Sequence, residues 1–432
     1  MVHLTLDPSW FDYPDVPLPD VWTVECLQPA PLLDGADSAA GAAARTLADA
    51  ARLPAGASVA VGVGSRGITG LEAAVRAVVA ALKTAGLRPF IVPAMGSHGG
   101  ATAEGQAAVL ASYGVTEERV GAPVRASMDV VQLAALEDGY PVYLDRLASE
   151  ADAILVVNRI KPHTDFHGRI ESGLAKMCSI GLGKRLGADA IHRFGADGLR
   201  ERMPRIARRV VECANVIGGV AILENLYGQT AEVHAVGPAG IGAGMEEELL
   251  RRARSLSPRL PFAELDVLIV DEMGKDISGS GMDTHVLGRA RIPSIREEEW
   301  DGPHVRIVCA LDLSERSHGN AAGIGLADMV TRRLVERVDW QATMTNHRTS
   351  GEGGVQRGHI PLVLEDGAAC ARAAIAACGR GGPVRLARIR STARVRMLQV
   401  TQPLAAEARD REDLRVVGGP HPLDPDTKLE VG

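Results

Sequence analysis

The sequence is poor in aromatic residues, which make up 3% of its 432 positions, and its six cysteines include no C-x-x-C pair. This pattern predicts neither a disulfide framework, nor a zinc knuckle, nor a cysteine-ligated iron–sulfur cluster. No apolar run approaches the roughly 18 residues that a membrane helix needs, and the chain begins with acidic residues and prolines instead of a basic signal sequence. We therefore expect a cytoplasmic protein that does not contact a membrane.

The chain also lacks an excess of positive charge. It carries 47 Lys and Arg against 54 Asp and Glu, a formal net charge of −7, and its basic residues form no continuous stripe. Such a balance excludes nucleic acid as an expected partner. What the chain has instead is 46% hydrophobic residues, chiefly small and branched aliphatics, which favour packed βα units. The predicted fold class is α/β, with mainly parallel sheets.

A strand–loop–helix pattern recurs in the first half. Apolar runs at 58–63 and 89–94 predict buried strands, and amphipathic stretches at 71–82 and 102–111 predict the helices that follow them. A third apolar run, at 153–157, also leads into a polar loop. Parallel sheets bind ligands beyond the carboxyl ends of their strands, so the three loops should converge on one cleft.

We expect two α/β domains with a cleft between them. The first, residues 1–262, would carry the cofactor and the catalytic histidines, and the second, residues 263–432, would close over the substrate and exclude water. The stretch most like a linker is 258–261. Strands of the second domain are predicted at 266–270, 305–311 and 384–390, and the tail at 420–425 is predicted to be irregular.

Two of the loops carry a candidate side chain each. Arg66 follows the first strand in a glycine-rich turn that lacks both the G-x-G-x-x-G and the phosphate-loop spacing, so it is either a solvated turn residue or an anion-binding arginine. His98 follows the second strand between glycines. It is either a surface residue or an acid–base catalyst, because imidazole accepts and returns protons near neutral pH.

The third loop holds His163 and His167, followed by Lys176 in apolar surroundings and by His192. The two loop histidines have helical spacing, but the neighbouring proline and glycine argue against a helix, and we expect one of them to hydrogen-bond the loop itself. A desolvated lysine becomes nucleophilic, whereas an exposed one is inert, and both interpretations fit Lys176. Lys184 competes with it for a nucleophilic or anion-binding role.

These residues resemble the nickel-pincer nucleotide-dependent lactate racemase family. The resemblance rests on Ser172-Gly-Leu-Ala-Lys176 with His192 at the family's interval, on Lys161-Pro-His163, and on Gly96-Ser-His98. The family implies a lysine that carries a pyridinium-derived mononucleotide, whose two sulfurs and one ring carbon bind nickel together with one histidine. It further implies a small 2-hydroxy acid substrate and transient contact with cofactor-synthesis enzymes.

Carried onto this chain, the resemblance makes Lys176 the attachment point and His192 the nickel ligand. His98 and His163 would be the paired acid–base residues and Arg66 the arginine that holds the substrate anion. Ser172, Gly173 and Lys184 would complete the cofactor site. The loop is about three residues longer than in the racemases, so either His163 or His167 could take the second acid–base place.

Two other functional classes remain open from the sequence. One is a divalent-metal-dependent lyase or hydrolase that uses His163, His167 and His192. The other is a binding protein without activity. Hydride transfer favours the racemase, because the C–H bond of a hydroxy acid is too weak an acid for histidine to deprotonate directly. We therefore predict a racemase or epimerase of a small 2-hydroxy acid.

Overall fold

The computed structural model describes residues 16–64, 67–379 and 382–430. The chain forms two compact units. The first unit comprises residues 30–257, and the second joins the segment that ends at Pro29 to the residues from Pro258 onwards. The second unit is thus assembled from both ends of the chain, whereas the sequence alone had predicted two consecutive domains.

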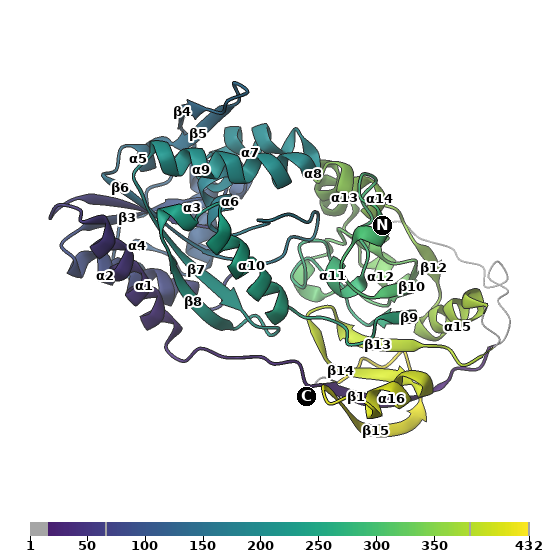
Figure 1. The fold of residues 1–432 in the computed structure, drawn as a ribbon. Coiled ribbons are helices and arrows are strands. Elements are labelled where there is room, and N and C mark those ends of the chain that lie inside the picture. Colours follow the sequence, from purple (N-terminus) through teal and green to yellow (C-terminus); the bar gives the residue numbers. More distant parts are fainter. Residues whose placement is uncertain (1–15, 65–66, 380–381, 431–432) are drawn as a thin grey trace. The chain divides into compact units, whose positions relative to one another are not determined.

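The first unit is built on a five-stranded sheet in the order β3-β2-β6-β7-β8 (Figure 1). The four strands β3, β2, β6 and β7 are parallel, and β8 pairs antiparallel with β7. The strands expected at 58–63, 89–94 and 153–157 are confirmed. The bounds are β2 (Ser58–Val63), β3 (Arg88–Pro93), β6 (Ala153–Arg159), β7 (Val216–Glu224) and β8 (Thr230–Val236).

Helices cover both faces of this sheet, because each strand presents apolar side chains on both sides. One face packs against α1 (Ala36–Ala51) and α2 (Leu71–Thr84), and the other against α9 (Met203–Cys213) and α10 (Gly244–Leu256). This unit also contains α3 (Ala103–Ser112), α4 (Glu117–Val120), the hairpin β4 (Val130–Ala135) and β5 (Pro141–Asp145), and α5 (Arg146–Ser149).

The strand order places a topological switch point between β2 and β6. From β2 the chain moves to β3 on one side and later returns to β6 on the other side. Ligands of open parallel sheets bind at such a point, beyond the carboxyl ends of the strands. A ligand site is therefore expected at the loops that follow β2 and β6.

The second unit has an eight-stranded sheet in the order β12-β11-β10-β9-β13-β14-β1-β15. The five strands β12, β11, β10, β9 and β13 are parallel to one another. Strands β14, β1 and β15 continue the sheet through antiparallel pairs. The strands are β9 (Glu264–Val270), β10 (His304–Ala310), β11 (Met329–Thr331), β12 (Leu362–Leu364), β13 (Leu386–Ser391), β14 (Arg394–Thr401), β1 (Asp20–Cys26) and β15 (Leu414–Pro422). The predicted second-domain strands are confirmed, but the tail that was expected to be irregular begins as part of β15.

One face of this second sheet packs against α15 (Gly367–Cys378), and the other against α12 (Arg332–Glu336) and α16 (Gln402–Arg409) (Figure 1). The unit also contains α11 (Thr284–Leu287), α13 (Trp340–Thr349) and α14 (Glu352–Arg357). Within the described part of the chain, no helix has the length and apolarity to cross a bilayer. All six cysteines are free thiols.

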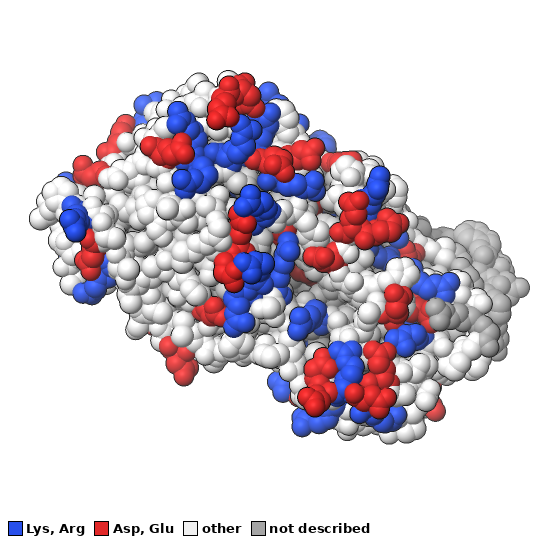
Figure 2. Space-filling model, viewed as in Figure 1, with Lys and Arg blue, Asp and Glu red and all other residues white. Residues whose placement is uncertain are grey.

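Basic and acidic side chains are interspersed on the face of the molecule drawn in Figure 2. In the described part of the chain, some ion pairs join neighbouring turns of one helix, such as Arg185 with Asp189. Exposed pairs of this kind contribute at most about 1 kcal/mol each.

Candidate functional site

The candidate site lies at the switch point of the first unit. Gly64 follows β2, and Asn158 is the last but one residue of β6. A Cβ atom at Gly64 would lie 3.2 Å from Asn158 Oδ1 and 3.3 Å from Met177 Sδ. The segment that carries Lys176 therefore packs against the carboxyl ends of β2 and β6. The sequence had predicted that the loops after these strands converge there. Arg66, the predicted anion-binding residue, lies outside the described residues.

The lysine sits at a junction between helix types. A short helix, α6 (Leu174–Lys176), continues into a π-helical turn at Met177–Gly181, and α7 (Lys184–His192) follows. Single π-helical turns are often found at functional sites because they shift side chains out of the regular helical register. Lys176 itself is half-buried, between Ala175 and Met177, which are buried.

A buried carboxylate caps this lysine helix from a distant part of the chain. Glu246, on α10, accepts the backbone N–H of Ala175 at 3.0 Å and that of Gly242 at 2.9 Å. Burial raises the pKa of Glu246 to about 7, although its backbone donors oppose the shift. At Gly173 the backbone has φ of 114°, and a Cβ there would lie 2.7 Å from Glu246 Oε1, so only glycine fits this turn.

Glu246 was not among the site residues predicted from the sequence. The available signal was its position on the apolar stripe of α10, three residues before Leu249 and four before Leu250, where a charged residue is out of place.

His163 contacts Lys176 directly. Its Nε2 lies 3.1 Å from Lys176 Nζ, its Nδ1 lies 3.2 Å from the backbone nitrogen of Asp165, and its ring packs against Phe166 with centroids 4.7 Å apart. These three contacts, with the lysine, the backbone and the phenylalanine ring, hold the imidazole beside the lysine.

His167 points to a different partner. Its Nδ1 lies 3.3 Å from Oε1 of Glu171, a fully buried carboxylate that also accepts the backbone N–H groups of His163 (2.8 Å) and Gly168 (3.0 Å) and pairs with Arg254 at 2.5 Å. Burial would raise the pKa of Glu171, but the hydrogen bond to His167, the charge of Arg254 and the backbone donors outweigh burial, and the pKa is lowered. Glu171 therefore organises the whole loop as a carboxylate.

His192 is the last residue of α7. Desolvation lowers the pKa of His192, and the charge of the nearby Lys176, when protonated, lowers it further, while Asp189 and Asp165 oppose both effects. The neutral imidazole that results has a free lone pair, which is the state that a metal ligand needs.

His98 follows β3, where the parallel pairing of β2 and β3 places it at the same edge of the sheet as Gly64. It is exposed, and its backbone nitrogen donates to Met95 O at 3.1 Å. Thr102 caps α3 by accepting the N–H of Gly105 at 3.0 Å.

Two predicted cofactor residues have internal partners. Ser172 Oγ donates to Lys161 O at 2.8 Å and accepts the N–H of Lys161 at 3.1 Å, so it closes the base of the loop. Lys184 is fully buried, and its Nζ contacts Pro93 O (2.6 Å), Gln106 Oε1 (3.1 Å) and Asp145 Oδ2 (3.1 Å). These three partners match the three donors of an ammonium group. Burial lowers the pKa of Lys184 and the Asp145 carboxylate opposes this shift.

Among the described residues, no group of three or more His, Cys, Asp or Glu side chains is arranged to hold a metal ion. His163 and His167, which the sequence offered as joint ligands, are directed to Lys176 and Glu171 respectively.

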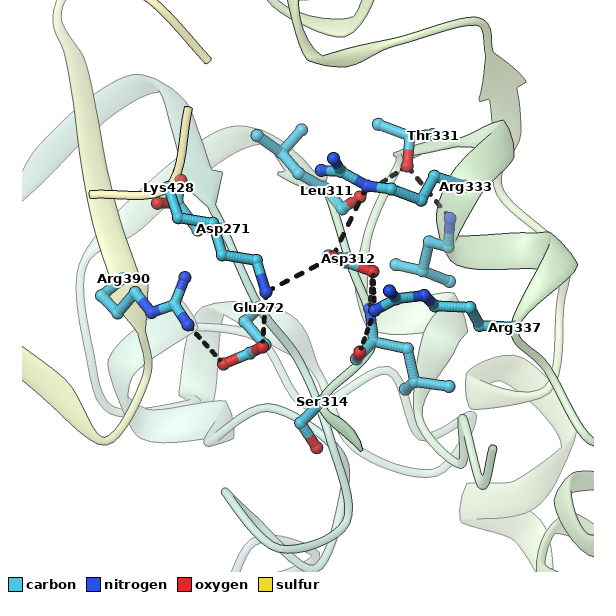
Figure 3. Close-up of polar contacts among 12 residues, drawn as sticks. Asp271, Glu272, Leu311, Asp312, Ser314, Thr331, Arg333, Arg337, Arg390 and Lys428 are labelled. Carbon is cyan, nitrogen blue, oxygen red and sulfur yellow. Dashed lines mark hydrogen bonds and ion pairs between the residues drawn. The ribbon is translucent and has the colours of Figure 1, made fainter. Parts of the chain in front are cut away.

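The second unit carries a charged network at the carboxyl ends of its own parallel strands (Figure 3). Asp312, just after β10, lies 3.0 Å from Arg337 and 3.5 Å from Lys428, and Lys428 also contacts Glu272, just after β9, at 3.0 Å. Arg390 pairs with Glu272 at 3.0 Å. Lys428, near the end of the described residues, thereby contacts the carboxyl ends of both β9 and β10. The sequence did not predict this contact.

Comparison with known protein families gives a match for this chain. Residues 44–194 match the model of the lactate racemase N-terminal domain, a segment that runs from α1 to just beyond His192. No curated protein matches the chain. The resemblance to the lactate racemases is thus confirmed over the segment that contains the candidate site.

Proposed function

Because this chain carries the N-terminal domain of the lactate racemase family, we propose that it is a racemase or epimerase of a small 2-hydroxy acid that uses a nickel-pincer nucleotide attached to Lys176. The observation that carries the proposal is the contact between His163 Nε2 and Lys176 Nζ at the switch point of the parallel sheet. It joins a candidate base to the candidate attachment point where an α/β sheet binds its ligands.

The residues present fit the cofactor. Lys176 offers a half-buried amine, and His192 offers an imidazole whose lowered pKa keeps it neutral for metal binding. When bound, the nickel-pincer nucleotide would supply the acceptor and donor for the substrate's hydride. Ser172 and Gly173 would act indirectly, because they shape the loop and turn that present Lys176.

The chain's own residues would handle the hydroxyl proton. His98 and His163 follow different strands at one edge of the sheet, and each would hold or release a proton at its ring nitrogen. A positioned proton transfer of this kind contributes roughly 10²–10⁴-fold to the rate. Of the two loop histidines we assign this role to His163, since the ring of His167 is engaged with buried Glu171. We assign Lys184 a structural role, because its donors already have internal partners.

The test begins with protein produced together with the cofactor-synthesis enzymes. We expect bound nickel, a mass increase confined to the peptide that contains Lys176, and interconversion of the enantiomers of a 2-hydroxy acid in a chiral assay. Lys176→Ala should lose all three. Zinc or manganese bound without any adduct on Lys176 would instead support the metal-dependent lyase or hydrolase.

A matched pair of variants separates the two histidines. His163→Gln in the loaded protein should lower kcat by roughly 10²-fold or more, because it removes a proton carrier. His167→Gln should change kcat much less and should mainly loosen the loop around Glu171. The opposite ranking would transfer the acid–base role to His167.

A further inference from the structure

The orientation of the His163 ring determines which of its nitrogens carries the proton. The backbone N–H of Asp165 is directed at Nδ1 over 3.2 Å. A backbone N–H can only donate, so Nδ1 must present a lone pair, and the proton of the neutral imidazole must lie on Nε2.

That assignment fixes the state of the neighbouring lysine. Nε2 lies 3.1 Å from Lys176 Nζ, and with its proton in place it can only donate. An ammonium group has no lone pair with which to accept, whereas a neutral amine has one. We propose that His163 holds Lys176 as a neutral, acylatable amine before the cofactor attaches, and that His163 is therefore a positioning residue for cofactor loading.

The carboxylate of Asp165 lies 3.9 Å from His163 Nδ1, beyond hydrogen-bonding distance, so the backbone N–H remains the closer partner of that nitrogen. The apolar surroundings support the same arrangement. Phe166 is fully buried and its ring packs against that of His163, which hinders the ring flip that would exchange the two nitrogens. The neighbours Ala175 and Met177 are buried, which disfavours a charged ammonium, yet Lys176 itself is only half-buried and stays accessible to a reagent.

The reaction that this state permits is acyl transfer to nitrogen. The amine lone pair attacks the carbon of a carboxyl-derived group, a C–N bond forms, and the bond from that carbon to its leaving group breaks. The leaving group departs with its electron pair, and the proton lost by nitrogen passes to water. No electrons are gained or lost. The identity of the natural acyl donor rests on the proposed function, but the state of the amine does not.

The experiment uses the full chain produced without the cofactor-synthesis enzymes. It is treated with limiting N-hydroxysuccinimidyl acetate near neutral pH, and acetylation of each lysine is followed by peptide mass spectrometry. An ordinary lysine is neutral in only about one molecule in a thousand at about pH 7.4. We expect Lys176 to react at least ~10-fold faster than exposed Lys83, and buried Lys184 not to react.

His163→Phe keeps a ring against Phe166 but removes the Nε2–H donor. It should bring the rate at Lys176 down to that of Lys83. The matched control is His234→Phe, which removes a half-buried histidine that lies 2.9 Å from a carboxylate of Glu232 on the same unit, and it should leave Lys176 reactive. Nitrogen-15 NMR of histidine-labelled protein should show the Nε2–H tautomer for His163 in the unsubstituted chain.

Lys176 that reacts no faster than Lys83, or an Nδ1–H tautomer at His163, would overturn the inference. These outcomes are distinct from failure of the proposed function. If Lys176 is reactive but never acquires the nucleotide, the proposed function is contradicted and this inference is not. If Lys176 is unreactive and still acquires the nucleotide, this inference is contradicted and the proposed function is not.

Discussion

At the scale of single residues, two buried carboxylates hold the candidate site in place. Glu171 accepts backbone N–H groups within the histidine loop, and Glu246 accepts those at the start of the lysine helix. Both carboxylates are buried, which raises a pKa, but the two pKa values shift in opposite directions because Glu171 has the side chains of His167 and Arg254 as partners, whereas Glu246 has backbone donors only. The two residues should therefore respond differently to pH.

Glu246→Gln should remove a pH dependence from the first unit. The pKa of Glu246 is raised to about 7, so the folded state holds its proton more tightly than the unfolded chain does. Its contribution to stability is complete below the ordinary pKa and is lost as pH rises towards 7, by about 3 kcal/mol in all. Hydrogen exchange of residues 174–180 should show the variant gaining protection relative to the unsubstituted protein between about pH 5 and pH 8.

The control for that change is Glu248→Gln, an exposed position on the same helix that pairs with Arg251. Its exchange profile should run parallel to that of the unsubstituted protein. Parallel profiles for Glu246→Gln as well would mean that Glu246 does not titrate in this range.

Glu171→Gln should destabilise the histidine loop at neutral pH. The substitution leaves Arg254 without its carboxylate, and we expect a loss of about 2 kcal/mol, below the value for a fully buried pair because the side chain of Arg254 is 35% exposed. Since the pKa of Glu171 is lowered, its stabilisation is present above the ordinary pKa and lost as pH falls through the lowered value. Exchange of residues 163–171 measures the effect.

Glu247→Gln serves as its control, because the partner of Glu247 is the mostly exposed Arg169, and it should cost less than about 1 kcal/mol. Equal losses in the two variants would contradict a special role for Glu171.

At the scale of elements, one buried ion pair connects three segments around the sheet edge. Asp145 ends β5 and caps α5 by accepting the N–H of Ala148 at 2.8 Å, while Lys184 opens α7 and reaches Pro93 at the end of β3. Lys184 has φ of 52°, a left-handed conformation that is uncommon for lysine and that its buried partners maintain.

Lys184→Met should therefore be destabilising by about 3–5 kcal/mol, because it leaves the Asp145 carboxylate buried without its cation. Adding Asp145→Asn removes that charge but keeps an oxygen for the cap of α5, and should recover much of the loss. Thermal unfolding by circular dichroism gives both values. If the double variant folds but cannot attach the cofactor at Lys176, Lys184 takes part in cofactor binding after all.

At the scale of the whole molecule, chain order and structural units do not coincide. Strand β1 lies between β14 and β15 in the sheet of the second unit, although the whole first unit and most of the second unit separate it from them in sequence. Without β1, strand β15 would lose its neighbour in the sheet.

We expect a fragment of residues 30–257 to be soluble and cooperatively folded, because it contains its complete sheet and both flanking cores. A fragment of residues 258–432 should fold only when residues 1–29 are supplied as a peptide or fused to it. None of the chain's four tryptophans falls within residues 30–257, so tryptophan fluorescence reports the folding of the second unit alone. Native fluorescence from 258–432 by itself would show that β1 is dispensable.

The sequence by itself determined the elements and the candidate residues. Continuous apolar runs specify buried parallel strands, and the spacing of Lys176 and His192 indicates the family, because both signals are local in the chain. Only the tertiary structure decided the partners. Glu246 reaches Ala175, Lys184 reaches Asp145, and β1 joins β14 and β15 through contacts between distant segments, which no local pattern specifies. The same holds for His163 and His167, because only the tertiary structure shows that one ring meets Lys176 and the other meets Glu171.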